Sequence, residues 1–127
     1  MSNTKAIEDL INGYATSEDS SFLLPNVTED FLAVRPSGNP ISAKGLVRMF
    51  DSEDLVAESS ELIKIHKIKI FDDMAFAVFT LNEVFSYKGN QNKDLSTYTC
   101  IFKNVSGTWK YSWMQRSQGT TDMSTWA

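Results

Sequence analysis

The sequence contains one histidine and one cysteine, so few of its side chains could take part in acid–base or nucleophilic chemistry. His66 is the only side chain whose ordinary pKa lies near neutrality, which makes it a candidate general acid or base. It lies between lysines in "KIHKIK", a mixed strand pattern in which a partly exposed histidine without a catalytic role is the alternative. Sequence order alone gives no geometry for a serine–histidine–aspartate triad.

Glu83 is the second candidate base. It shares one face of a predicted strand with Phe79, Leu81 and Phe85, and a carboxylate held among apolar side chains is a stronger base than one in water. Such a group could remove a proton from a carbon next to a carbonyl. The alternative is a structural glutamate that pairs with an arginine, Arg116 or Arg48, across a dimer interface.

Large side chains with polar tips suit a pocket for a mostly apolar ligand, because each combines apolar area with a directed hydrogen bond. Alternation along two strands predicts two shared faces. One holds Tyr98, Cys100 and Phe102, and the other holds Trp109, Tyr111, Trp113 and Gln115. The predicted pocket lining is Tyr14, Tyr98, Cys100, Trp113 and Gln115. The same side chains could instead form core or a dimer interface, and a lone cysteine between aromatic residues is commonly a small buried hydrophobe.

Composition narrows the class of partner. The chain of 127 residues carries a formal charge of −4 with scattered basic residues, which disfavours a nucleic-acid partner. The sequence has neither metal-ligand spacing nor a glycine-rich phosphate loop, and its single cysteine excludes an intrachain disulfide, so we expect no metal and no cofactor. No apolar run approaches the ~20 residues of a membrane span and no signal segment is apparent, so we expect a cytoplasmic protein without membrane contact.

The first half of the chain predicts two helices separated by a strand reversal. Apolar residues at helical spacing predict a helix over about 4–16, with Asn3 or Thr4 as its N-cap. "DFLAVR" predicts a short strand, and the "PSGNP" that follows predicts a tight reversal. Ser42 then caps a second helix that ends in "DSED".

The second half predicts four long strands, at 61–71, 75–88, 94–104 and 108–118. Hairpin turns between them favour an antiparallel meander. Both faces of these strands carry apolar bulk, so one face should meet the helices and the other a second copy of the chain. Residues 119–127 form a polar tail, and we expect residues 1–127 to make a single domain.

This order of elements, with "RPSGNP" and the ending "FKNVSGTWKYSWMQRSQG", resembles the nuclear-transport-factor-2-like (NTF2-like) superfamily. The chain is most similar to its SnoaL-like group and to the association domain of calcium/calmodulin-dependent kinase. Their last hairpin has an aromatic strand, a Gly-Trp turn and an end near His-x-Ser-Gly, a shape that Gly107, Trp109, Ser117 and Gly119 match. The resemblance implies a cone-shaped α+β fold, with helices cupped by a strongly bent antiparallel sheet, and a homodimer formed through the outer sheet face.

The chain also departs from the kinase association domain. Cys100 stands in place of the arginine of its penultimate strand, and Trp113 and Gln115 stand in place of the histidines of its last strand. This argues against a carboxylate-binding pocket of that kind. Three functions remain open: a small-molecule-binding protein, a cofactor-free isomerase, dehydratase or cyclase with Glu83 or His66 as base, and a structural association domain.

Overall fold

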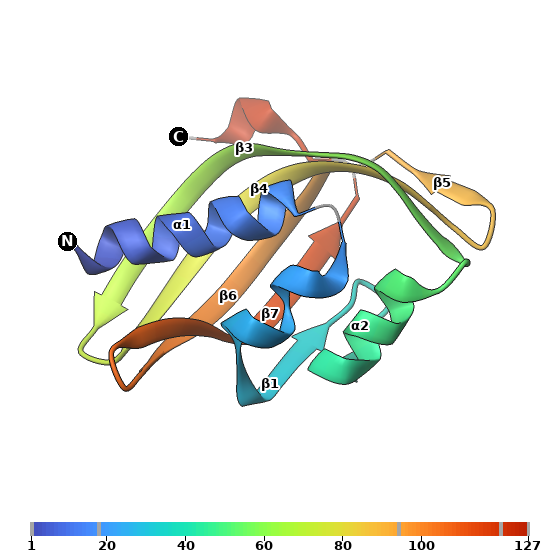
Figure 1. The fold of residues 1–127 in the computed structure, drawn as a ribbon. Coiled ribbons are helices and arrows are strands. Elements are labelled where there is room, and N and C mark those ends of the chain that lie inside the picture. The colour runs from blue at the N-terminus through green and yellow to red at the C-terminus, as the bar shows by residue number, and fades with distance from the viewer. Residues whose placement is uncertain (1, 18, 94, 120, 127) are drawn as a thin grey trace.

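A strongly curved sheet wraps around a long N-terminal helix in the computed structural model, which describes residues 2–17, 19–93, 95–119 and 121–126 (Figure 1). The helix, α1 (Asn3–Thr16), lies across the concave face of the sheet and buries Ile7, Leu10 and Ile11. Its N-cap is Ser2, whose side chain accepts a hydrogen bond from the Lys5 backbone N–H at 3.1 Å. The prediction of Asn3 or Thr4 as N-cap was therefore wrong.

The predicted strand reversal and second helix are confirmed. After two short 3₁₀ turns (Ser20–Phe22 and Leu24–Asn26), β1 (Val27–Val34) turns back through Gly38 into β2 (Pro40–Ser42). Gly38 has a φ of +88°, a conformation that glycine adopts without steric cost. Ser42 caps α2 (Ala43–Asp51) by accepting from the Gly45 backbone N–H.

The four predicted long strands form the expected antiparallel meander. They are β3 (Leu55–Phe71), β4 (Met74–Tyr87), β6 (Leu95–Val105) and β7 (Thr108–Gln118), and the sheet order is β2-β1-β7-β6-β4-β3. β3 begins at Leu55 rather than at residue 61, because residues 55–60 pair with residues 83–87 at the end of β4. β1 joins β7 in parallel, so the sheet is mixed, and the short β5 (Asn90–Asn92) pairs with β4. Asp94, where the third strand was predicted to begin, lies outside the described residues.

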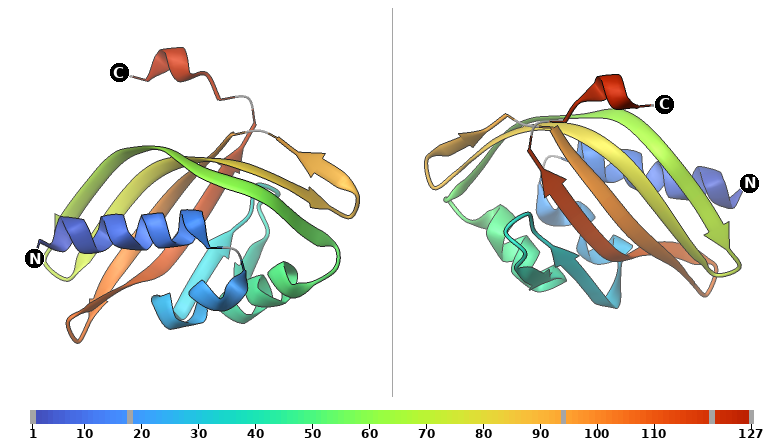
Figure 2. Two further views of the ribbon diagram at one scale, coloured as in Figure 1. Left: turned by 45° about the horizontal axis from the view of Figure 1, so that its top comes forward. Right: turned by 180° about the vertical axis from the view of Figure 1, so that it is seen from behind.

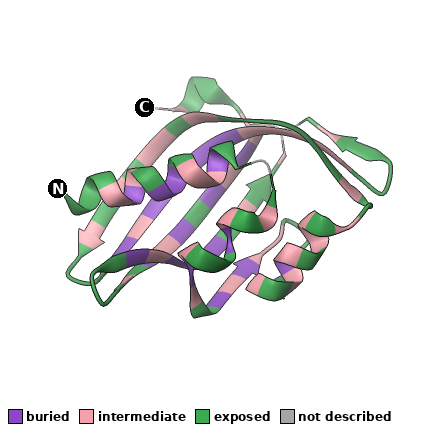
Figure 3. Cartoon of the chain, viewed as in Figure 1, coloured by how far each residue is buried: buried purple, intermediate pink, exposed green. Residues whose placement is uncertain are grey.

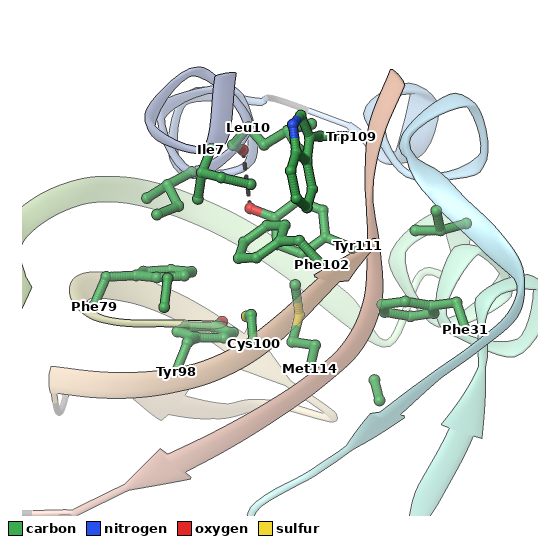
Figure 4. Packing of buried hydrophobic residues seen from close by; sticks show 14 of the residues in the cluster. Ile7, Leu10, Phe31, Phe79, Tyr98, Cys100, Phe102, Trp109, Tyr111 and Met114 are labelled. Atoms are coloured by element: carbon green, nitrogen blue, oxygen red, sulfur yellow. Dashed lines mark hydrogen bonds between the residues drawn. The ribbon is translucent and has the colours of Figure 1, made fainter. Parts of the chain in front are cut away.

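The core lies between α1 and the concave face (Figure 3). It is closely filled by aromatic and aliphatic side chains, including Phe79, Tyr98, Cys100, Phe102 and Tyr111, each exposed by no more than 2% (Figure 4). The rings interlock: Phe79 stacks on Tyr98 with centroids 5.2 Å apart, and Phe102 packs against Tyr111 at 4.6 Å. These interlocked rings therefore fill the space between α1 and the sheet.

A β-bulge in β7 changes which side chains face the core. Ile101 pairs with Trp113 while its neighbour Phe102 pairs with Tyr111, so Ser112 is an extra residue in the ladder. Before the bulge Tyr111 faces the core, and after it Met114 and Arg116 do, opposite Cys100 and Tyr98. The predicted face that united Trp109 and Tyr111 with Trp113 and Gln115 was therefore wrong.

Beyond β7, the tail folds back over the convex face (Figure 2). A short 3₁₀ turn, Met123–Thr125, precedes Trp126, whose ring meets the His66 ring edge-on with centroids 4.5 Å apart. Of the predicted polar tail 119–127, Thr120 and Ala127 lie outside the described residues. Among the described helices none is long and apolar enough to cross a membrane.

Candidate functional site

A chain of polar side chains lies at one end of the concave face, where the apolar core stops. The Tyr98 hydroxyl, from β6, donates a hydrogen bond to Glu83 Oε1, from β4, at 2.7 Å. The Tyr14 hydroxyl, from the end of α1, lies 3.4 Å from the Tyr98 hydroxyl. Three elements that are distant in sequence thus bring two tyrosines and a carboxylate together.

Arg116 completes this group from β7. Its Nε donates to Ser96 Oγ at 3.1 Å and lies 3.4 Å from Glu83 Oε1. Its Nη2 donates to Gln118 Oε1 at 2.7 Å, and its guanidinium carbon lies 5.1 Å above the centre of the Phe85 ring. Because several groups hold it, the guanidinium has a defined orientation beside the carboxylate. We call Tyr14, Glu83, Tyr98 and Arg116 the concave cluster.

The two tyrosines act as hydrogen-bond donors at neutral pH. Burial raises the pKa of Tyr14 and of Tyr98, and the negative charge of Glu83 raises both further. Both hydroxyls therefore stay protonated, and the Tyr14 hydroxyl can donate to Tyr98 while Tyr98 donates to Glu83. The two hydroxyls form a short relay that ends on the carboxylate.

One oxygen of Glu83 remains for a further partner. The hydrogen bond from Tyr98 and the 3.4 Å contact from Arg116 Nε both go to Oε1, and within the described part of the chain Oε2 has no hydrogen-bond partner. The Glu83 side chain keeps 17% of its area exposed and that of Arg116 keeps 18%, so both can be reached from solvent. The concave cluster therefore presents an acceptor oxygen beside a cation.

The predicted site residues separate into two faces. Tyr14, Tyr98 and Glu83 meet in the concave cluster. His66 lies on the convex face, where its Nε2 is 2.7 Å from Thr80 Oγ1, so it cannot share a site with Glu83. Trp113 and Gln115 also face the convex side, because of the bulge at Ser112.

Cys100 lies within the core and is fully buried. Burial raises the pKa of its thiol well above the ordinary value, which keeps the sulfur protonated and unreactive. The Tyr98 ring is also buried, so only its hydroxyl reaches the cluster. Cys100 thus has the environment of a small buried hydrophobe.

The surface has hollows away from the concave cluster. One, of about 210 Å³, is lined by Thr97, Ser117, Gln118, Gly119 and Thr121 on the convex side. Another, of about 320 Å³, lies at the β3–β4 turn and is lined by Phe71, Asp72, Asp73, Met74, Ala75, Phe76 and Ile101. Neither is lined by Tyr98, Cys100 or Glu83. No group of three or more potential metal ligands occurs among the residues that the structure describes.

Sequence reasoning missed several supporting residues. Ser96 shares the alternation of Tyr98 and could have been placed on the same face by period two. Asn92, which donates to the Glu83 backbone oxygen at 3.3 Å, gave no such signal, because it lies in the three-residue strand β5. Arg116 was weighed as a partner for Glu83 across a dimer interface, whereas the pair forms within one chain.

Comparison with known proteins agrees with this architecture. An NTF2-like protein of unknown function from Prochlorococcus is 48% identical over 99% of this chain and 100% of its own, with a TM-score of 0.90. A proposed Ca/calmodulin-dependent kinase II association domain from Exiguobacterium sibiricum is 12% identical, with coverages of 96% and 97% and a TM-score of 0.80. A hexachlorocyclohexane dehydrochlorinase is 14% identical, with coverages of 91% and 84% and a TM-score of 0.78.

The last two likenesses show the fold alone. No functionally curated protein matches the chain. The model of a family of proteins of unknown function, DUF3804, matches residues 2–127. The chain therefore belongs to the DUF3804 family, and its fold is that of the NTF2-like superfamily.

Proposed function

We propose that this is a cytoplasmic small-molecule-binding protein whose ligand contacts the concave cluster, at the end of the concave face where the apolar core stops. The observation that carries the proposal is the half-buried Glu83–Arg116 pair, oriented by Tyr98, Ser96 and Gln118. Orienting a carboxylate and a guanidinium from several elements restricts side-chain freedom, and such preorganisation lowers the cost of binding. Tyr14 of α1 adjoins the pair through Tyr98, which supports a ligand site where the helix meets the sheet.

The cluster favours a ligand with a hydrogen-bond donor next to an apolar portion. Oε2 of Glu83 accepts from such a donor, and the Phe85 ring below Arg116 offers apolar contact. The aromatic core leaves little depth beneath the cluster, because Phe79 and Tyr98 fill it. The ligand therefore rests on the cluster instead of entering the core.

A retention experiment tests this proposal. The protein is equilibrated by dialysis against a defined mixture of primary metabolites, and the compounds enriched on the protein side are identified by mass spectrometry. We expect at least one compound with a hydroxyl or amino group to be enriched by the wild type. Glu83→Gln replaces an acceptor oxygen with a donor, so we expect it to abolish that enrichment.

Glu61→Gln is the matched control, since Glu61 is an exposed glutamate on β3 that pairs with Asn82 in the ladder and lies outside the cluster. It should retain the compound as the wild type does. Equal loss in both variants, or no enrichment by the wild type, would contradict the proposal. The association role would then be the better account of the fold.

A second function is favoured by one observation, the unshared Oε2 of Glu83. A carboxylate oxygen beside a cation can accept a proton from a carbon acid while the cation stabilises the negative charge that develops. This is a cofactor-free isomerase, dehydratase or cyclase type of chemistry with Glu83 as base. Hydrogen–deuterium exchange at a carbon of the retained compound, followed by proton NMR in D₂O, tests it. Exchange that is equally fast with Glu83→Gln would reject Glu83 as the base.

We further propose that two copies of the chain associate through the convex sheet face. A row of apolar side chains crosses that face from strand to strand, and we call it the convex apolar row: Phe71, Met74, Phe76, Ile101 and Trp113. Phe71 is 51% exposed and Met74 44%. Large exposed apolar residues that adjoin one another are typical of an interaction surface.

A further inference from the structure

A second row of side chains, of opposite character, crosses the convex face. The sheet register pairs Thr80 of β4 with Thr97 of β6, and Thr97 with Ser117 of β7. His66 of β3 continues this row beyond Thr80. We call His66, Thr80, Thr97 and Ser117 the convex polar row. Thr80 lies four residues along β4 from Phe76, so the polar row is about 13 Å from the apolar one at ~3.3 Å per residue.

Hydrogen bonds connect three members of this row. His66 Nε2 lies 2.7 Å from Thr80 Oγ1, which lies 2.8 Å from Thr97 Oγ1. Thr80 is fully buried, and burying a hydroxyl costs free energy unless it is hydrogen-bonded. The two bonds therefore hold Thr80 in place and connect the imidazole to the Thr97 hydroxyl.

We call the hydrogen-bonded groups His66, Thr80 and Thr97 the convex relay, and it ends at a hollow. Thr97 and Ser117 form part of the lining of the 210 Å³ convex hollow, with Gln118, Gly119 and Thr121 around them. The tail thus contributes to the hollow at one end of the row, and at the other end its Trp126 ring covers His66. The convex face therefore has a recess that the tail borders.

We propose that this hollow binds a small neutral molecule that bears hydroxyl groups, such as a sugar or a polyol. Its lining supplies three hydroxyls, from Thr97, Ser117 and Thr121, and no charged side chain lines it. The carboxamide of Gln118 is bonded to Arg116 and Asn92. An anion would find no cation there and would meet a chain of formal charge −4. The hollow is also smaller than the ~300–1,000 Å³ of sites for drug-sized ligands, which limits the ligand to a small molecule.

The relay suits a hydroxyl ligand because it can reverse its direction. If His66 Nε2 accepts, Thr80 donates to it, Thr97 donates to Thr80, and the Thr97 oxygen accepts from the ligand. If Nε2 carries the proton, every bond reverses and Thr97 donates to the ligand. A sugar hydroxyl is both donor and acceptor, so it can be matched in either state.

This site is separate from the proposed ligand site of the concave cluster. Thr97 and Tyr98 are adjacent in β6 and therefore point to opposite faces of the sheet. Gln118 adjoins both sites, but no variant changes it, so a failure of one proposal leaves the other standing.

NMR titration of the ¹⁵N-labelled full chain tests the inference, with glucose, glycerol and inorganic phosphate as probes. We expect glucose or glycerol to cause saturable shifts of the Thr97, Ser117 and Gly119 amides, and phosphate to cause none. Thr97→Val keeps the side-chain shape but removes the hydroxyl, and should weaken binding roughly three- to tenfold. Thr99→Val is the matched control, because Thr99 lies on the same face of the same strand, exposed and outside the hollow, and it should leave binding unchanged.

Ser117→Ala provides a second test if Thr97→Val does not fold, since Ser117 is exposed and also lines the hollow. It too should weaken binding. The inference is overturned if neither glucose nor glycerol shifts these amides saturably, if phosphate alone does so, or if the folded variants of the hollow bind as tightly as Thr99→Val.

Discussion

Among single residues, Tyr111 connects the helix to the sheet through one buried hydroxyl, which donates to the Leu10 backbone oxygen of α1 at 2.9 Å. We predict that Tyr111→Phe lowers the free energy of unfolding by about 1 kcal/mol, the net contribution of one hydrogen bond. Urea denaturation measures this, with Tyr87→Phe as control because Tyr87 is 38% exposed. Equal stability of Tyr111→Phe and the wild type would show that this bond does not help to hold α1.

His66 gives the second residue-level prediction. Burial lowers the pKa of His66 from its ordinary 6.5, and the positive charge of Lys64 lowers it further. The unfolded chain then binds a proton at a higher pH than the folded chain does. The stability that comes from neutral His66 is therefore complete above pH 6.5 and is lost as the pH falls through the lower folded value.

The free energy of unfolding is measured in urea at several pH values from about 7.5 to about 5, a range that brackets the ordinary histidine pKa. The wild type should lose more stability on acidification than His66→Gln does. In addition, Lys64→Gln should raise the pKa of His66 seen by NMR, because it removes the repelling charge. A His66 pKa at or above 6.5 in the folded wild type would refute this account.

The sequence identified part of the concave cluster for physical reasons. Glu83 and Tyr98 stood out because regular alternation in β4 and β6 assigned them to the apolar face. Alternation alone could not predict that Glu83 pairs with Arg116 of the same chain. This pairing depends on an extra residue in β7, which shifts Arg116 to the face opposite the one that alternation predicts.

Among the elements, β7 is the one whose local irregularity determines the site. The extra residue Ser112 lets Tyr111 and Met114 both face the core, although their spacing would place them on opposite faces of a regular strand. The helices and the antiparallel meander were predictable because their patterns run over many residues. A bulge is a single-residue event without a periodic signal, and so it escaped prediction.

Deleting Ser112 tests the role of the bulge. Without Ser112, Tyr111 and Met114 are two residues apart and both still face the core of a regular strand. We therefore predict that the deletion variant folds and loses no more than about 1–2 kcal/mol in the free energy of unfolding, the range of an ordinary substitution. Ser112→Ala keeps the residue count and serves as the control. Its stability should stay close to that of the wild type in urea denaturation. A loss of about 2–5 kcal/mol in the deletion variant, as for large core truncations, would mean that Ser112 is not the extra residue of the ladder.

At the scale of the whole molecule, both faces of the sheet can bury apolar area, because its strands carry apolar side chains on both. The concave face is covered by α1, whereas the convex apolar row keeps Phe71 and Met74 exposed. A twofold dimer brings the same patch of two chains together and covers it without requiring a different partner. The wild type should therefore elute with twice the chain mass of 14.3 kDa when analysed by size-exclusion chromatography with light scattering.

Replacing both Phe71 and Met74 by serine should shift the mass to that of one chain, because the exposed area that drives association is removed. These side chains are exposed, so the single chain should remain folded by circular dichroism. Leu24→Ser is the matched control, because Leu24 is also 51% exposed but lies in a 3₁₀ turn away from the convex row. A wild type that stays monomeric at about 100 μM would argue against a dimer, since a specific interface typically has a lower dissociation constant. A double variant that stays dimeric would place the interface on another surface.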